Sequence, residues 1–338
     1  MENSTQIALV SAAQAGDRTA FDTLMKPYQR ELLVHCYRML GSVHDAEDLV
    51  QETLIRAWEK RATFIDHRSY RAWLYSIATN LCLNVLTRSP KRSLPPDTYP
   101  AIDPTAPLPP KLREPIWLEP FPDEMLADQH TDPENHALQR ERITLAFLVA
   151  LQHLTPTQRA ILLLREVLDW SASEVAEWLN LSVPAVNSAL QRARRTLQQL
   201  QLFHEAPPVL ASTQLQTLLD RYVKLWEQAD IPGLVALLRE DAWFTMPPIP
   251  GWFQGRAAIT TFFQNTVFTA PGKWRLYPIR ANASPAFGLY RWEASVDAYQ
   301  LYGLLVLDIV EEQIANTITF LELSSLAPFA LPDIFPLS

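Results

Sequence analysis

Residues 155–195, TPTQRAILLLREVLDWSASEVAEWLNLSVPAVNSALQRARR, carry the strongest signal of local structure in the chain. The segment contains three apolar, helix-like runs, and each begins at a residue that can cap a helix. The caps are Thr155, followed by Pro156 and Gln158, then Ser171, followed by Glu174, and finally Ser182. The first two have the spacing of a capping box, and Pro suits the first helical position. The segment therefore predicts three short helices joined by tight turns.

The last of these helices has one apolar and one polar side. Its inner stripe consists of Val186, Leu190, Ala193 and Leu197, and its outer side carries Asn187, Ser188, Gln191, Arg192, Arg194 and Arg195. This pattern predicts a DNA-binding helix-turn-helix, in which the early polar residues contact base edges and the arginines contact phosphates. The alternative is an ordinary helical packing unit with a solvated arginine face, although such a face has no need of the polar residues 187, 188 and 191.

A proline-rich segment precedes the helix-turn-helix. Twelve of the 27 prolines lie between Pro90 and Pro133, and this density excludes a long helix or a central strand. We expect an acidic linker, partly extended, that either mimics nucleic acid in a basic channel or simply connects two domains. Within it, WLEPFPD places Trp117 and Phe121 among prolines, and exposed aromatic side chains favour a docked segment.

The two ends of the chain have different patterns. Residues 21–40, 46–58 and 70–85 repeat apolar side chains at helical spacing, which predicts a helical bundle. Residues 212–338 combine helical patterns at 212–230 and 255–268 with several strand-like runs, which predicts an α+β domain with a mostly antiparallel sheet.

Length and composition agree with several soluble domains. The chain has 338 residues, a net charge of −8 and only two cysteines, Cys36 and Cys82, so we expect neither a disulfide framework nor a cysteine-based zinc site. The sequence has no run long enough to span a membrane and no signal peptide at its start, and the predicted location is the cytoplasm. Residues 136–204 are the only segment with a basic surplus, seven basic against five acidic groups.

Three motifs resemble the extracytoplasmic-function (ECF) sigma factors of the sigma-70 family. HDAEDLVQETLIRAWEK (44–60) and SYRAWLYSIATNLCLNVLTR (69–88) are similar to sigma region 2, and the helix-turn-helix is similar to region 4. WLEPFPD (117–123) and MPPIPGWFQG (246–255) resemble the SigJ- and SigG-type subgroup with a C-terminal SnoaL-like domain, and the SigG-like branch resembles this chain most.

The resemblance implies four segments. They are a region 2 helical domain (1–89), the Pro-rich linker (90–135), a region 4 helix-turn-helix domain (136–204) and an α+β SnoaL-like domain with a cone-shaped fold (212–338). The implied function is that of a sigma factor, which binds core RNA polymerase, recognises the −10 and −35 promoter elements and starts transcription. The implied partners are promoter DNA and the polymerase β′ clamp and β flap; no cofactor or membrane is expected, and the free protein is expected to be a monomer.

The resemblance also assigns roles to individual residues. Asp48, Gln51 and Glu52 would dock on polymerase, the alternative being a solvated charged face. The residues expected to bind DNA are Arg71, Asn80 and Arg88 in region 2, and Ser182, Asn187, Ser188, Gln191, Arg192, Arg194 and Arg195 in region 4. Tyr70 and Trp73 fit either a base contact or the core.

For the SnoaL-like domain the resemblance implies a curved sheet around helices and a pocket. The residues expected to form a regulatory contact or line the pocket are Pro247, Pro248, Pro250, Trp252, Phe253, Trp292 and Asp297. All seven histidines precede residue 212, and Glu293 with Asp297 is the only candidate acid–base pair, so a ligand-sensing or interaction role is expected rather than catalysis.

Two rival functions remain open. One is an enzyme or small-ligand-binding protein whose helical part only targets DNA. The other is a helix-turn-helix regulator that does not bind polymerase, and the polymerase-docking helix argues against it. We further expect the C-terminal domain to be tethered closely to both DNA-binding domains and to clamp them in the free protein.

Overall fold

The computed structural model describes residues 2–63, 70–112, 117–126, 143–199, 212–270 and 272–336. The chain divides into two compact units. The first consists of Met1–Lys91 and Ala150–Leu202, and the second of Arg92–Val149 and Phe203–Ser338. The linker residues therefore belong to the same unit as the C-terminal domain. The prediction of four segments is a finer division than these units and stays a prediction.

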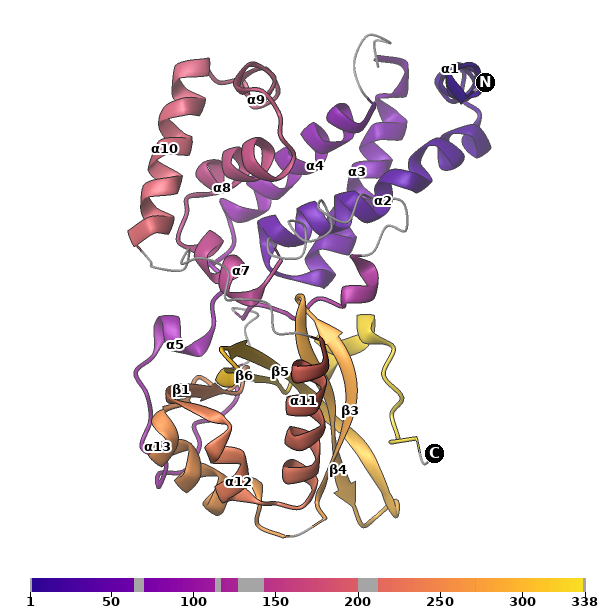
Figure 1. Cartoon of the computed structure of the whole chain (residues 1–338). Coiled ribbons are helices and arrows are strands. Elements are labelled where there is room, and N and C mark those ends of the chain that lie inside the picture. The colour runs from indigo at the N-terminus through magenta and orange to yellow at the C-terminus, as the bar shows by residue number, and fades with distance from the viewer. Residues whose placement is uncertain are drawn as a thin grey trace. The chain divides into compact units, whose positions relative to one another are not determined.

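The first unit begins with a helical bundle, which we call the N-terminal bundle (Figure 1). Its helices are α1 (Glu2–Gln14), α2 (Arg18–Leu40), α3 (Val43–Glu59) and α4 (Tyr70–Leu86), with the 3₁₀ turn η1 (Arg61–Thr63) after α3. Asp17 and Ser42 cap α2 and α3 through side-chain oxygens, and Gly41 ends α2 in the left-handed conformation. Side-chain caps of this kind and a left-handed glycine are common start and stop signals of helices.

The same unit contains the helix-turn-helix part. After α7 (Leu145–Gln152) it comprises α8 (Pro156–Leu162), the π-helical turn η3 (Leu163–Val167), α9 (Ala172–Trp178) and α10 (Val183–Gln199). Both predicted capping boxes are present, with Thr155 and Gln158 at α8 and Ser171 and Glu174 at α9. The Ser182 hydroxyl accepts a hydrogen bond from the Ala185 amide at the start of α10. The predicted helix-turn-helix is confirmed.

The second unit is built on a six-stranded sheet of strand order β2-β1-β6-β5-β4-β3. The strands are β1 (Leu238–Thr245), β2 (Trp252–Gln254), β3 (Trp274–Ala281), β4 (Ser284–Glu293), β5 (Ala298–Val310) and β6 (Gln313–Phe320). Only β1 and β6 pair in parallel, and the other pairs are antiparallel. The sheet thus has the mostly antiparallel character that was predicted.

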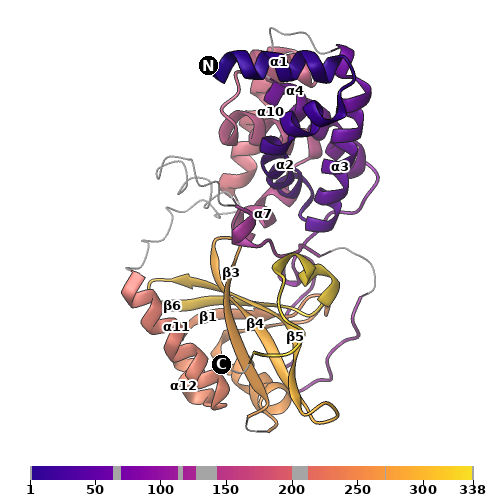
Figure 2. The ribbon, with the colours of Figure 1, turned by 90° about the vertical axis from the view of Figure 1, so that its right-hand side faces the viewer.

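Helices cover one side of this sheet (Figure 2). They are α11 (Ser212–Glu227), α12 (Ile231–Ala236) and α13 (Gly255–Phe262), which continues into the π-helical turn η4 (Phe263–Val267). Short helical turns also occur at α5 (Pro95–Thr98), η2 (Asp123–Met125) and η5 (Leu323–Phe329). The predicted fold class, two helical parts and an α+β domain, is confirmed.

Aromatic side chains fill the space between the helices and the sheet. Tyr222 stacks on Phe287 with ring centroids 5.8 Å apart, and Phe253 stacks on Phe262 at 4.2 Å. Trp226 meets Phe263 edge to face. All of these rings are buried, so their apolar area stabilises the domain. None of the described helices is both long and apolar enough to cross a membrane.

Candidate functional site

The predicted polymerase-docking residues lie on one side of α3. Its buried stripe includes Ala46, Val50, Thr53 and Ala57, and Asp48 and Gln51 are exposed on the other side. Glu52 is half-buried and its carboxylate bonds Arg56 at 2.7 Å. Ile55 was not predicted, yet its side chain is 54% exposed. The exposure of Ile55 could have been predicted from the sequence, because its position falls outside the apolar stripe of the helix. The face thus combines carboxylates with one exposed apolar side chain.

The structure places the candidate DNA residues of α4 in different environments. The guanidinium of Arg71 bonds Glu31 at 2.6 Å and lies over the ring of Tyr75, whereas Asn80 is exposed and its amide donates to the Ser76 carbonyl. Arg88 is exposed after the end of the helix. Tyr70 and Trp73 are buried, 6% and 9% exposed, and belong to the core of the bundle.

The outer face of α10 is open. Every residue predicted there is exposed: Ser182, Asn187, Ser188, Gln191, Arg192, Arg194 and Arg195. Arg194 is nevertheless engaged, because its Nε donates to Glu166 at 2.5 Å. That ion pair joins α10 to η3 and fixes the orientation of the arginine. The predicted base-contacting positions 187 and 191 are one helical turn apart on the same face.

The linker lies against the loop between β1 and β2. The amide of Ile102 donates to the carbonyl of Trp252 at 2.9 Å, and the indole of Trp252 donates back to the carbonyl of Tyr99 at 2.8 Å. Further along, the amide of Leu112 donates to the carbonyl of Pro248 at 3.0 Å. The motif MPPIPGWFQG therefore binds the linker through its backbone and one indole.

A glycine in that loop permits this close approach. A Cβ atom built on Gly251 would lie 2.5 Å from Cδ1 of Ile102, nearer than a van der Waals contact allows. Hydrogen bonds to Leu321 connect this loop to the linker. Pro247 accepts a hydrogen bond from the amide of Leu321 at 2.9 Å, and the carbonyl of Leu321 accepts one from Lys111 of the linker at 3.3 Å.

A second docking point lies at the turn between β3 and β4. The side-chain oxygen of Asn282 accepts a hydrogen bond from the Phe121 backbone amide at 2.8 Å, and the backbone amide of Asn282 donates to the Phe121 carbonyl at 2.9 Å. The side-chain nitrogen of Asn282 donates to the carbonyl of Ile143 at 2.8 Å. Next to it, Asp123 accepts a hydrogen bond from the amide of Ala283 at 2.7 Å. Trp117 and Phe121 are buried, so WLEPFPD is docked, as its aromatic residues predicted.

Comparison with known proteins decides the family. Residues 24–92 match the model of sigma-70 region 2, and residues 144–197 match that of sigma-70 region 4. Over 321 residues the chain is 44% identical to the ECF RNA polymerase sigma factor SigG of Mycobacterium tuberculosis, which covers 94% of this chain and 85% of that protein. This chain belongs to the ECF sigma factors. Region 2 covers the N-terminal bundle from residue 24 onward, and region 4 covers the helix-turn-helix part.

Other relatives show which parts of this sigma factor are general. SigW of Bacillus subtilis is 29% identical over 190 residues, which are 56% of this chain and 93% of that protein. The crystal structure of the M. tuberculosis sigma factor SigJ covers 92% of this chain and 99% of its own, with a TM-score of 0.61 at 20% identity. The fold, C-terminal domain included, is thus shared with another sigma factor.

The residues predicted as one regulatory contact or pocket lie in several places. The linker-binding loop described above contains Pro247, Pro248, Pro250 and Trp252. Phe253 lies in the aromatic core. Trp292 is 40% exposed and packs edge to face on Tyr299 at the β4–β5 end of the sheet, where Asp297 occupies the connecting turn with a φ of 52°.

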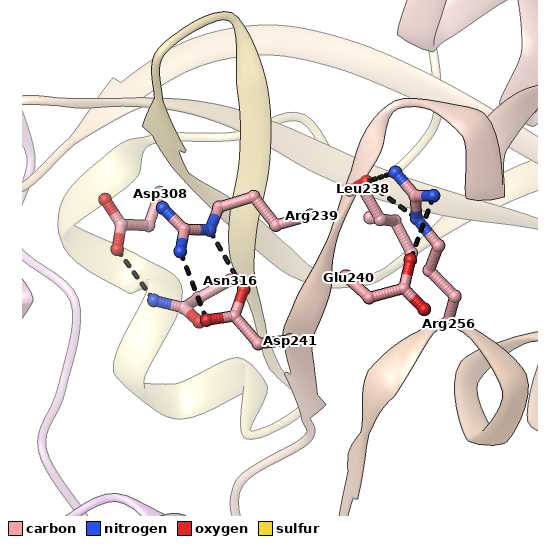
Figure 3. A network of polar contacts seen from close by, with 7 residues as sticks. All are labelled: Leu238, Arg239, Glu240, Asp241, Arg256, Asp308 and Asn316. Carbon is pink, nitrogen blue, oxygen red and sulfur yellow. Dashed lines mark hydrogen bonds and ion pairs between the residues drawn. The ribbon is translucent and has the colours of Figure 1, made fainter.

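A polar network that the sequence did not indicate lies on β1, β5 and β6 (Figure 3). Arg239 forms two hydrogen bonds with Asp241, and Asn316 donates to Asp308 at 2.7 Å. Burial raises the pKa of the Asp308 carboxyl, and the hydrogen bond from Asn316 opposes this. Each side chain of the network has a partner within the protein, which is typical of a structural cluster. Glu293 and Asp297, the pair considered from sequence, lie outside it.

Proposed function

We propose that this sigma factor docks on the polymerase β′ clamp through the exposed face of α3. The support is the arrangement of Asp48, Gln51 and Glu52 beside the exposed Ile55. A central apolar contact within a polar rim is the usual composition of a protein interface. Region 4 would bind the β flap.

Promoter recognition is divided between two helices in this proposal. The exposed outer face of α10 would enter the major groove at the −35 element, with Asn187 and Gln191 on base edges and Arg192 and Arg195 on phosphates. Asn80 and Arg88 are the exposed candidates of α4 for the −10 element. The ion pair of Arg71 with Glu31 makes Arg71 a positioning group for Tyr75 as well as a candidate for DNA.

The C-terminal domain would regulate the factor by holding its linker. Support comes from the two docking points, at the β1–β2 loop and at Asn282. They engage backbone groups of Tyr99, Ile102, Leu112 and Phe121 and the side chain of Asp123. Those groups cannot bind a polymerase channel and the domain at once. Polymerase and the C-terminal domain would therefore compete for the same segment.

We propose no catalytic role for that domain. It contains no histidine, and aromatic rings pack its interior, which supports an interaction module over an enzyme. The proposed setting is the cytoplasm, with the free factor a monomer. The earlier expectation that the domain clamps both DNA-binding domains stays a prediction.

Charge reversal on α3 tests the proposal. A full-length Asp48→Lys/Glu52→Lys variant should lose co-purification with core polymerase, because both carboxylates would become repulsive or unpaired at the interface. Asp22→Lys, at an exposed position of α2, is the control for added positive charge and should bind core normally. Unchanged binding by the double variant would contradict the docking face and favour a regulator that works without polymerase.

A further inference from the structure

Within the first unit, an arginine of region 4 is buried in region 2. Arg159 stands in the first turns of α8, is 2% exposed, and donates a hydrogen bond from Nη1 to the carbonyl of Met39. Met39 lies in the last turn of α2, where carbonyl groups lack partners within the helix and the helix dipole favours a cation. The contact is reinforced by Trp170, which meets Tyr75 of α4 edge to face at 5.9 Å.

A pair of thiols lies between α2 and α4, and one of them, Cys82, interacts with that arginine. Cys36 of α2 and Cys82 of α4 are the only cysteines of the chain; both are completely buried, and their side chains are hydrogen-bonded to each other. Arg159 and Cys82 are close enough to interact electrostatically. His35, next to Cys36 on α2, bonds Thr79, which lies about one helical turn before Cys82 on α4, at 2.9 Å. Region 4 thus covers the place where α2 and α4 meet.

This docked arrangement is incompatible with binding both promoter elements. The −10 and −35 elements are roughly 25 base pairs apart, or about 85 Å of duplex at 3.4 Å per base pair. A helix of 17 residues such as α10 measures only about 26 Å at 1.5 Å per residue. Regions joined by a direct hydrogen bond cannot reach both elements, so region 4 must leave region 2 before a promoter is bound.

We propose that Arg159 is a latch between the two sigma regions, and that its release exposes Cys82 as a modification site for small disulfides. In the docked state the thiol is covered. Burial also raises its pKa, so the reactive thiolate is scarce. After release, the Cys82 thiolate attacks one sulfur of the disulfide. A mixed disulfide forms at Cys82, the old sulfur–sulfur bond breaks, and the other half departs as a thiolate.

Modification would in turn hold the factor open. Cys82 is 0% exposed in the docked state, so no space remains there for an added group, and Arg159 could not return to the Met39 carbonyl. The latch would therefore couple the thiol state of the cell to the population of a factor that can span a promoter. This inference concerns the contact between regions 2 and 4 and does not depend on the linker mechanism proposed above.

The test measures the reactivity of Cys82 in full-length protein. In a Cys36→Ser background Cys82 is the only thiol. The probe is the small disulfide dithiobis(nitrobenzoate), which releases one coloured thiolate for each exchange with Cys82. We expect slow release from this protein and a rate at least about 10-fold higher after Arg159→Ala, with Arg159→Lys between them, since lysine keeps the charge but loses the planar fork. Arg194→Ala, which removes a region 4 arginine bound to Glu166, is the matched control and should leave the rate unchanged.

Equal rates in the Arg159→Ala and unsubstituted proteins would overturn the latch. If Arg159→Ala fails to fold, as circular dichroism would show, the proposal is tested in the wild-type chain. Mass spectrometry then quantifies the modified Cys82 peptide with and without core polymerase. An increase on adding core is expected, and an unchanged extent of modification would again contradict the proposal. The first measurement needs no polymerase, so its failure is distinct from failure of the α3 docking face.

Discussion

Two contacts in this molecule hold a distant segment of the chain, and they do so by different chemistry. Region 4 is attached to region 2 through a buried guanidinium, which lies against the end of α2 and interacts with the Cys82 thiol. The linker is attached to the C-terminal domain through several hydrogen bonds at two docking points, most of them between neutral groups. The first contact is centred on one charged side chain, with the Trp170–Tyr75 ring pair beside it. The second is distributed, so it can give way in steps while the rest stays bound.

The largest expected effect concerns Asn282, the residue that makes the most hydrogen bonds to the linker segment. Asn282→Ala removes two buried side-chain hydrogen bonds and places alanine at a φ of 52°. Each buried group left without a partner costs about 1–3 kcal/mol, so the second unit should lose about 3 kcal/mol or more. Urea unfolding of the full chain measures this. Asn282→Gly keeps the backbone conformation and should recover only the strain; full recovery by glycine would show that the side-chain bonds contribute little.

The next effect is the pH dependence of stability that His35 causes, in region 2 close to the contact of Arg159. Burial lowers the pKa of His35 to about 3, with Arg38 and Arg71 adding to the shift. The unfolded chain binds a proton near pH 6.5 and the folded chain does not, so stability is complete above pH 6.5 and falls as the pH drops toward 3. The loss should be about 1.4 kcal/mol per pH unit, or about 2 kcal/mol at pH 5.

Substitution of this histidine provides the check on that pH dependence. His35→Gln should flatten the pH dependence of unfolding between 6.5 and 5, while His44→Gln, at an exposed position of α3, should leave it unchanged. A pH slope that survives in His35→Gln would assign the acid sensitivity to other groups.

A smaller effect is expected at the β1–β2 docking point. Gly251→Ala should push Ile102 away from the loop and weaken the linker contact by about 1 kcal/mol, because the obstructing atom is the flexible end of a side chain. Ile102→Ala in the same chain should remove the conflict. Protease cleavage within 99–112 measures the contact, and identical cleavage of the single and double variants would show that the close approach is unimportant.

The smallest effect lies outside both contacts, on the face of α10 that is proposed to bind DNA. Arg195→Ala should weaken promoter binding evenly across sequences and reduce the salt dependence by about one unit, whereas Asn187→Ala and Gln191→Ala should change which −35 sequence is preferred. Arg194→Ala should reduce the salt slope less than Arg195→Ala, since Glu166 already neutralises Arg194. A change of preferred promoter in Arg195→Ala would contradict this division.

The sequence predicts the parts of the molecule that local rules determine. The capping boxes at Thr155 and Ser171, the exposed face of α10 and the docked aromatic residues of WLEPFPD are all visible in short stretches. The partners of these stretches are not. Arg159 looks like any arginine in a first helical turn, and nothing in its spacing indicates that it enters another bundle.

The contacts of the linker with the C-terminal domain could not be predicted from the sequence for a related reason. Backbone amides such as those of Ile102 and Leu112 make hydrogen bonds that any residue could make, so only the close approach at Gly251 and the left-handed Asn282 leave a trace in the sequence. Trp292 and Asp297, expected from the sequence to form a regulatory contact or line a pocket, lie at the β4–β5 turn, and that expectation stays a prediction.

Hydrogen exchange of the linker in the free, full-length factor tests the central claim most directly. The account predicts slow exchange at the amides of Ile102, Leu112 and Phe121, which donate to Trp252, Pro248 and Asn282, and faster exchange at Phe121 in Asn282→Gly. Exchange at all three amides at the rate of an unstructured chain would contradict it, because the C-terminal domain would then hold no linker for polymerase to take.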